Sequence, residues 1–168
     1  MFKKILLTAA LVASFVYAAV PRPLVDMIIP LPQGKPLALK AYRGKVLLVA
    51  MITTDCKTCQ ASIEVLSHLQ NDFGTKEFQV VAVAGDQNAQ YMIEPFVQRF
   101  RPTFPVGYLT ADQMALLGDI RKEDRHFAPI MMFVDRKGVV RQQIYGDNPI
   151  FKNEEPSLRK MVQDMLKP

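Results

Sequence analysis

An apolar run that leads directly into two closely spaced cysteines constrains the fold of this chain most strongly. Residues 46–52 read VLLVAMI, which suits a strand buried on both faces. Residues 53–59 read TTDCKTC and hold Cys56 and Cys59, the only two cysteines of the chain. An amphipathic pattern then predicts a helix as far as Phe73, closed by Gly74. The cysteines are therefore predicted at a strand-to-helix junction.

Helical periodicity gives the two thiols different surroundings. At about 100° per residue, one arc of the predicted helix collects the apolar residues 63, 65, 66, 69 and 73. Cys59 falls inside that arc, and Cys56 falls on its rim. We expect Cys56 to be accessible at the N-terminus of the helix and Cys59 to lie behind it. The helix N-terminus and the neighbouring Lys57 should both favour a thiolate at Cys56.

The rest of the pattern predicts an α/β domain with a central mixed sheet flanked by helices. A proline-rich stretch, residues 20–36, is predicted as an extended arm leading into a β-hairpin that turns at 33–35. The expected elements that follow are a strand at 78–84, a helix at 88–99 interrupted by Pro95, a strand at 104–108, a helix at 111–117, a strand pair at 130–134 and 139–145 that turns at 135–138, and a final helix capped by Asn153.

The N-terminus has the three parts of a secretory signal peptide. Lys3 and Lys4 are basic, residues 5–16 are almost entirely apolar, and residues 16–18 read VYA, with small residues where a signal peptidase cuts. We expect a signal peptide at 1–18 and a mature domain at 19–168, in which 19–45 form the arm and hairpin. The protein would then be exported, to the periplasm in a bacterium. An uncleaved anchor is the alternative, although a transmembrane helix needs about 20 apolar residues.

Export allows disulfides to persist, but the cysteine spacing argues against a static crosslink. A disulfide stabilises a fold by closing a long loop of the unfolded chain, and this loop is very short. A zinc site is also disfavoured, because it needs four ligands. The spacing therefore favours a pair of reactive thiols. No cofactor or resident metal is predicted, and a monomer is expected. The formal net charge of +5 is spread without a basic stripe, so no nucleic-acid partner is expected.

Two segments together carry a resemblance to a known fold. Residues 42–59, YRGKVLLVAMITTDCKTC, and residues 128–140, APIMMFVDRKGVV, resemble the thioredoxin fold. More narrowly, the chain from about residue 30 onward resembles the exported thiol-disulfide oxidoreductases of the TlpA/ResA type. The resemblance implies that Cys56 attacks the disulfide of a protein client and that Cys59 resolves the mixed disulfide.

The same resemblance implies a substrate-binding surface and an electron donor. Pro129 would be a cis-proline facing the cysteines, and Ala128 would offer its backbone to an extended client segment. Lys57 and Asp55 would border the same site. An upstream thiol-disulfide protein would return the electrons.

The chain departs from the family pattern at three positions. Asp55 stands where the family usually has tryptophan, Ala50 stands where thioredoxins bury an acid, and Ser62 stands where some ResA-like proteins place a glutamate. Asp55 would either raise the pKa of Cys56 or serve as the helix N-cap. These departures leave Cys59 without an identified proton acceptor, so we expect differently tuned reductase activity.

Three other functions are compatible with the residues. A peroxiredoxin-like peroxidase would use Cys56, with Thr53 three residues before it, although Val49 replaces the expected proline and only Arg125 is available as an arginine partner. A copper carrier would bind Cu(I) through Cys56, Cys59 and His126. The third alternative is a thioredoxin-like scaffold that serves only for protein contact.

Overall fold

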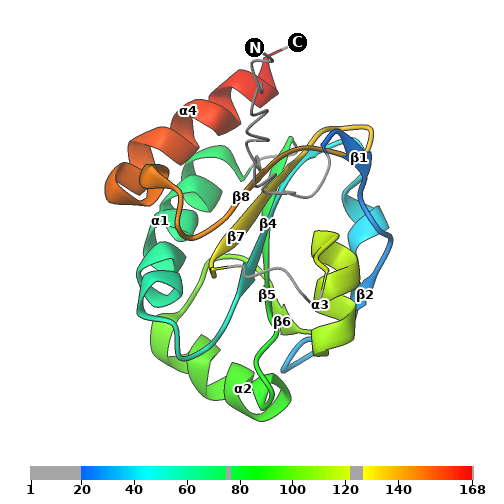
Figure 1. Cartoon of the computed structure of the whole chain (residues 1–168), viewed down its shortest axis with the longest axis vertical. Helices are drawn as coiled ribbons and strands as arrows, with labels where there is room; N and C mark the ends of the chain where they lie inside the picture. Colours follow the sequence, from blue (N-terminus) through cyan, green and yellow to red (C-terminus); the bar gives the residue numbers. More distant parts are fainter. Residues whose placement is uncertain (1–19, 75–76, 122–126, 168) are drawn as a thin grey trace, which may run out of the picture.

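A six-stranded mixed sheet forms the centre of the protein (Figure 1). The computed structural model describes residues 20–74, 77–121 and 127–167. The strand order is β1-β8-β7-β4-β5-β6, with β4, β5 and β6 parallel and with β7, β8 and β1 joined to them by antiparallel pairings. The strands are β1 (Arg22–Pro23), β4 (Val46–Ile52), β5 (Phe78–Ala84), β6 (Val106–Tyr108), β7 (Ile130–Val134) and β8 (Val139–Ile144).

Helices and the N-terminal arm cover the two faces of this sheet. In Figure 1, α1 and α4 lie along one face, while α3 and the strand β2 lie on the other. The hairpin pairs β2 (Ile28–Ile29) with β3 (Leu37–Ala38). The helices are α1 (Lys57–Phe73), α2 (Ala89–Phe100), α3 (Ala111–Gly118) and α4 (Glu154–Leu166), with short 3-10 turns η1 (Leu39–Tyr42) and η2 (Pro149–Asn153).

The central strand β4 supplies both layers of the core. All seven of its residues are buried, as a strand covered on both faces requires. Leu48, Ala50 and Ile52 pack in the cluster that α1, α2 and α4 complete. Leu47, Val49 and Met51 pack in the second cluster, against the arm, the hairpin and α3. A fixed β4 therefore fixes the point at which the chain turns into α1.

The sequence-based fold prediction is confirmed. The sheet is mixed, helices flank it, and the hairpin turns at Gly34, whose φ is +88°. Pro95 lies inside α2 without ending it. The strand predicted at 104–108 is shorter, since β6 spans only Val106–Tyr108, and the strand predicted at 139–145 ends at Ile144.

Two details of the prediction are wrong or incomplete. Asn153 occupies the N-cap position of α4, but its side chain makes no capping hydrogen bond. The arm also enters the main sheet as β1, because Arg22 is held on the face that α3 covers. Its guanidinium donates to the Leu117 carbonyl at 3.1 Å and to the Gln143 side chain at 2.8 Å. No local sequence signal predicts either contact.

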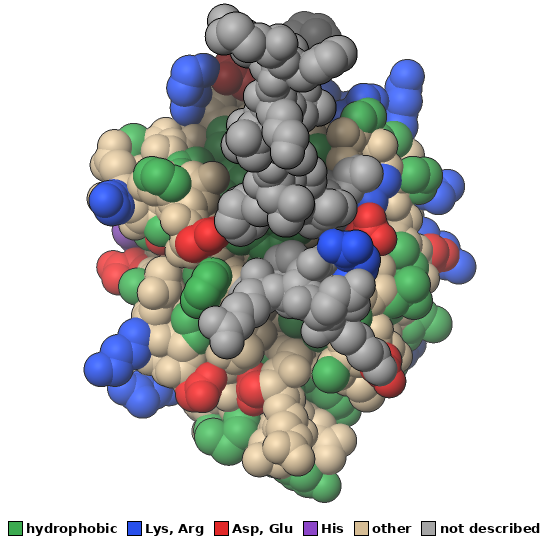
Figure 2. All heavy atoms as spheres, in the orientation of Figure 1, with side chains coloured by type: hydrophobic (Ala, Val, Ile, Leu, Met, Phe, Trp, Pro, Cys, Tyr) green, Lys and Arg blue, Asp and Glu red, His purple; other side chains and the backbone are tan. Residues whose placement is uncertain are grey.

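Some predictions concern residues that the structure does not describe. The signal peptide at 1–18, Arg125 and His126 lie outside the described ranges. Within those ranges, no helix has the length and apolar character needed to cross a membrane. On the face shown in Figure 2, most lysine and arginine side chains lie toward the outline, and they are not gathered over one element.

Candidate active site

The loop between β4 and α1 carries the cysteines and is held by the residues that follow β5. The amide of Gly85 donates to the Ile52 carbonyl at 3.1 Å. Thr54 donates through its amide to Asp86 Oδ1 at 2.8 Å and through its hydroxyl to Asp86 Oδ2 at 3.0 Å. Gln60 of α1 donates to the Thr54 carbonyl at 2.8 Å. Hydrogen bonds therefore hold the loop both to the segment that follows β5 and to α1.

Cys56 and Cys59 form a disulfide at the first turn of α1. Cys56 is the N-cap residue, and its sulfur accepts a hydrogen bond of 3.1 Å from the Cys59 amide. Cys59 is fully buried, whereas Cys56 is only partly buried. The predicted difference between the two sulfurs is therefore observed. In the reduced protein, the same amide and the helix N-terminus would stabilise a thiolate at Cys56.

Asp55 does not cap the helix, contrary to one of the two expectations for it. Its carboxylate accepts a hydrogen bond of 2.8 Å from the Thr53 hydroxyl and is exposed. The capping position is occupied by a sulfur instead of the oxygen that usual N-cap residues supply. Lys57 is also exposed at the first position of α1. Both charged side chains therefore border the accessible cysteine.

The corner at Ala128 and Pro129 lies against the cysteine pair, as the resemblance implied. The Ala128–Pro129 peptide is cis, and the Ala128 carbonyl oxygen lies 3.8 Å from Cys56 Sγ. The Gly146 amide donates to the Phe127 carbonyl at 2.7 Å and thereby holds the corner against the end of β8. Pro129 is buried, while the neighbouring Phe127 is 57% exposed. An apolar side chain is therefore exposed one residue before the corner that contacts Cys56.

Sequence reasoning missed several residues that shape this site. Asp86 lies 32 residues from its partner Thr54, and Gly146 meets the corner from beyond β8. Phe127 gave no sequence signal either, because a single aromatic residue has no periodicity. Ala50 and Ser62, which replace the family acids, are both fully buried. Neither side chain can retain a proton from Cys59 as a carboxylate would.

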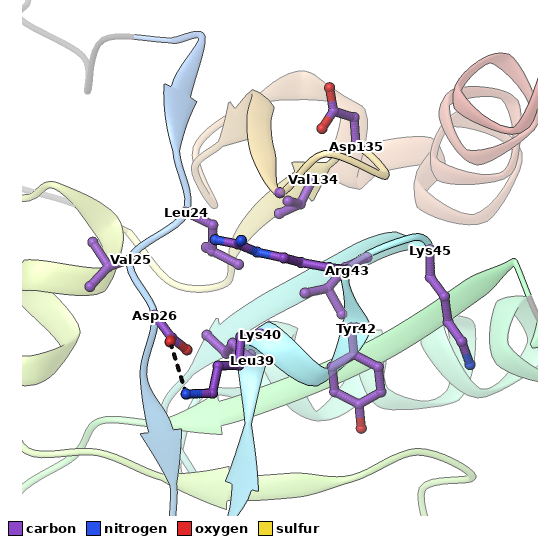
Figure 3. A pocket seen from close by; sticks show the side chains of 12 residues that line it. Leu24, Val25, Asp26, Leu39, Lys40, Tyr42, Arg43, Lys45, Val134 and Asp135 are labelled. Atoms are coloured by element: carbon purple, nitrogen blue, oxygen red, sulfur yellow. Dashed lines mark ion pairs between the residues drawn. The ribbon is translucent and has the colours of Figure 1, made fainter.

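Metal ligands and cavities are the other features that could support chemistry. Within residues 20–74, 77–121 and 127–167, no group of three or more His, Cys, Asp or Glu side chains could hold a metal ion. Since His126 lies outside these ranges, the copper-carrier alternative stays a prediction. The pocket in Figure 3 has a volume of about 20 Å³, room for about one water molecule. It is lined by Lys45 and Leu47, at the end of β4 away from the cysteines.

The fold and the cysteine geometry define a thioredoxin-like protein with a C-x-x-C disulfide at the first turn of α1. The Redoxin family profile matches residues 21–162. The chain therefore belongs to the Redoxin family.

Individual relatives agree with this assignment. The thiol-disulfide oxidoreductase ResA of Bacillus thuringiensis subsp. konkukian is 24% identical over 123 residues, which cover 73% of this chain and 68% of that protein. Mouse glutathione peroxidase 7 is 30% identical over 92 residues, or 51% of this chain and 48% of that protein. The similarity to TlpA/ResA-type proteins is therefore confirmed, and a peroxidase branch is also represented among the relatives.

Solved structures share the fold. A candidate thiol:disulfide interchange protein DsbE from Chlorobium tepidum superposes with a TM-score of 0.74 at 22% identity, covering 88% of this chain and 97% of that one. A second thiol:disulfide interchange protein from Chlorobium tepidum TLS gives 0.69 at 19% identity, covering 89% and 99%. At these identities the comparison establishes the thioredoxin-like fold.

Proposed function

We propose that this protein is an exported thiol-disulfide oxidoreductase that exchanges disulfides with protein clients through Cys56 and Cys59. The observation that carries the proposal is the arrangement of the pair. One sulfur is accessible at the N-cap of α1, 3.8 Å from the Ala128 carbonyl oxygen, and the other is fully buried behind it. This arrangement suits a two-step exchange and adds little as a crosslink.

In the first step, the Cys56 thiolate attacks one sulfur of a client disulfide. A bond forms between Cys56 and that sulfur, the client S–S bond breaks, and the other client sulfur leaves as a thiolate that takes up a proton. In the second step, Cys59 loses its proton and attacks Cys56. The mixed disulfide breaks, the client leaves as a dithiol, and the protein holds the observed disulfide. An upstream thiol donor must then supply two electrons to reopen it.

We propose that the client segment lies across the corner at Ala128. The Ala128 carbonyl oxygen faces the attacking sulfur and can accept a hydrogen bond from an extended client backbone. Phe127 offers exposed apolar area on one side, and Lys57 and Asp55 offer charge on the other. A surface of this kind recognises backbone and general polarity, which suits unfolded or extended protein segments. We propose that the protein acts as a monomer.

The test is insulin reduction by the wild type and two cysteine variants. Cys56→Ser should abolish reduction, because it removes the attacking thiolate. Cys59→Ser should form a mixed disulfide with the client that cannot be resolved and that is visible as an adduct by mass spectrometry. Insulin reduction that persists in Cys56→Ser contradicts the assigned roles. A redox titration of the pair against glutathione then decides whether the protein works as a reductase or as an oxidant.

A peroxidase is the second candidate, because several relatives are glutathione peroxidases. A peroxiredoxin-like peroxidase would require a hydrogen bond from Thr53 to the Cys56 thiolate, but the Thr53 hydroxyl here donates to Asp55 at 2.8 Å. We therefore expect the reduced protein to consume peroxide no faster than a free thiol of equal thiolate content. Rapid peroxide consumption that is lost in Thr53→Val would favour the peroxidase instead.

A further inference from the structure

A buried carboxylate oxygen points toward the cysteine-bearing helix from the first residue of α4. The side chain of Glu154 is half-buried, and its Oε1 atom is shielded from solvent without a hydrogen-bond partner among the described residues. The carboxylate lies within hydrogen-bonding reach of the Ser62 side chain. A shielded carboxylate oxygen without a donor is costly, so its presence requires an explanation.

The packing of α4 on α1 directs Glu154 inward. The two helices lie side by side (Figure 1), and they are joined by contacts of Glu155 with His68 at 3.2 Å and of Arg159 with Asp72 at 2.7 Å. Glu154 lies one turn before the fully buried Leu158 and therefore shares its inward face. Its neighbour Glu155, in contrast, contacts the charged or polar side chains of His68 and Arg159.

Ser62 connects this carboxylate to the cysteine end of α1. It is the one fully buried polar side chain among the described residues. Ser62 follows Cys59 by three positions, so the two buried side chains are neighbours on one face of α1. The hydroxyl donates its single proton to the Thr58 carbonyl at 3.1 Å. It can therefore accept a hydrogen bond from a protonated Glu154, or turn and donate to an ionised one.

We propose that Glu154 holds the proton that Cys59 loses in the resolving step and that it acts through the Ser62 hydroxyl. The proposal rests on the thiol-disulfide exchange proposed above and adds to it the missing proton acceptor. Since the carboxylate acts through Ser62 and not on the sulfur directly, Glu154 is a positioning residue for the reaction.

The proton balance of the resolving step is simple. The Cys59 thiol gives its proton to Ser62 Oγ, and the Ser62 proton passes to the Glu154 carboxylate. The Cys59 thiolate then attacks Cys56, forms the Cys56–Cys59 bond and releases the client sulfur. When the upstream thiol donor supplies two electrons and reduces the disulfide again, a proton returns from Glu154 through Ser62 to Cys59.

The surroundings of Glu154 suit this role. Burial raises the pKa of Glu154, and the hydrogen bond with Ser62 lowers it in part, so that the pKa remains above its ordinary value. A carboxylate that binds protons more readily is a better acceptor for a thiol proton. The charged side chains on the facing parts of α1 and α4 contact one another instead: His68, Asp72, Glu155 and Arg159.

An aromatic disulfide whose thiolate product is coloured tests the proposal in a single trace. Attack by Cys56 on this reagent releases one coloured thiolate, and resolution by Cys59 releases a second. The first phase therefore reports the proposed function, and the second phase reports the inference. The variants are Glu154→Gln, Ser62→Ala and the matched control Glu155→Gln, each followed over a pH range that extends from below to above the ordinary thiol pKa of about 8.5.

We expect Glu154→Gln to slow the second phase by about tenfold or more below that pKa. Its rate should converge with the wild type at higher pH, where Cys59 ionises unaided. The first phase should not change. Ser62→Ala should show the same pH-dependent defect, and Glu155→Gln should match the wild type in both phases. A merely structural role for Glu154 would not produce a defect that vanishes with pH.

Two outcomes overturn different parts of the account. A second phase in Glu154→Gln that matches the wild type at every pH refutes the role of Glu154 and leaves the exchange mechanism intact. A wild type without a first phase refutes the proposed function itself. If Glu154→Gln does not fold, Ser62→Ala decides, because a normal second phase in that variant removes the relay.

Discussion

Replacing Gly146 by alanine should displace the corner at Ala128 from its position beside Cys56 while leaving both cysteines intact. A Cβ atom at Gly146 would lie 2.7 Å from the Ala128 carbonyl carbon and 2.9 Å from the Phe127 carbonyl oxygen, and nearer still to the Ala128 oxygen. Carbon contacts are comfortable only from about 3.5 Å. The two backbone segments must therefore separate by roughly 1 Å, since no flexible side chain is available to give way.

The displacement should affect exchange more than stability. Overpacking of this kind costs about 1–3 kcal/mol of unfolding free energy. A misplacement of about 1 Å in a reacting geometry can lower a rate on the order of a hundredfold. We therefore expect kcat/KM for insulin reduction to fall between about tenfold and a hundredfold. Urea denaturation of the same preparation measures the cost in stability.

Gly44→Ala is the matched control for this experiment. Gly44 has a φ of +91°, and an added Cβ would meet nothing within 4 Å. Alanine there costs about 1–2 kcal/mol through its left-handed backbone, a loss similar to that expected at Gly146. Gly44 precedes β4, at the end of the strand away from the cysteines, so exchange should be unchanged. Equal activity in the two variants would refute the argument that the Gly146 contact positions the corner.

Three further predictions concern the loop between β4 and α1, the turn between β7 and β8, and the Cys56 thiolate. Asp86→Ala removes both hydrogen bonds to Thr54 and should lower the urea-measured unfolding free energy by about 1–3 kcal/mol; an unchanged value would show that the loop is held otherwise. Burial alone would raise the pKa of Asp135, but hydrogen bonds from the Val139 amide, the Arg141 side chain and the Lys137 amide outweigh it and lower the pKa. The stabilisation that ionised Asp135 provides is therefore present above its unfolded-state pKa and is lost as pH falls through the lower folded-state pKa. Asp135→Asn should therefore weaken the dependence of the urea midpoint on pH at acidic pH. An unaltered pH dependence would refute this. Asp55→Asn removes a negative charge beside the Cys56 thiolate and should speed its alkylation by iodoacetamide at neutral pH; a slower reaction would contradict this sign.

The parts of the fold that are periodic in sequence were predictable. The runs that form β4 and β5 are almost entirely apolar, and α1 has one apolar arc. The residues of each element therefore indicate which of its faces are buried. The same periodicity separated the buried Cys59 from the partly exposed Cys56. Local chemistry therefore located the site and assigned different environments to its two sulfurs.

The partners that complete the site were not predictable from local pattern. Asp86 and Glu154 reach the cysteine region only because β5 and α4 pack beside β4 and α1. The cap of α1 was misassigned in one of the two expectations because N-cap statistics favour an oxygen, and Asp55 was the nearest oxygen-bearing residue. In the folded protein the sulfur of Cys56 takes that place, while Asp55 accepts a hydrogen bond from Thr53.

Brief alkylation of the reduced protein, followed by peptide mass spectrometry, tests the inequality of the two sulfurs most directly. A small excess of iodoacetamide under native conditions should modify Cys56 and leave Cys59 free, because Cys59 is fully buried. Full unfolding before alkylation should make the two cysteines react alike. Equal modification of both under native conditions, or preferential modification of Cys59, would contradict the account.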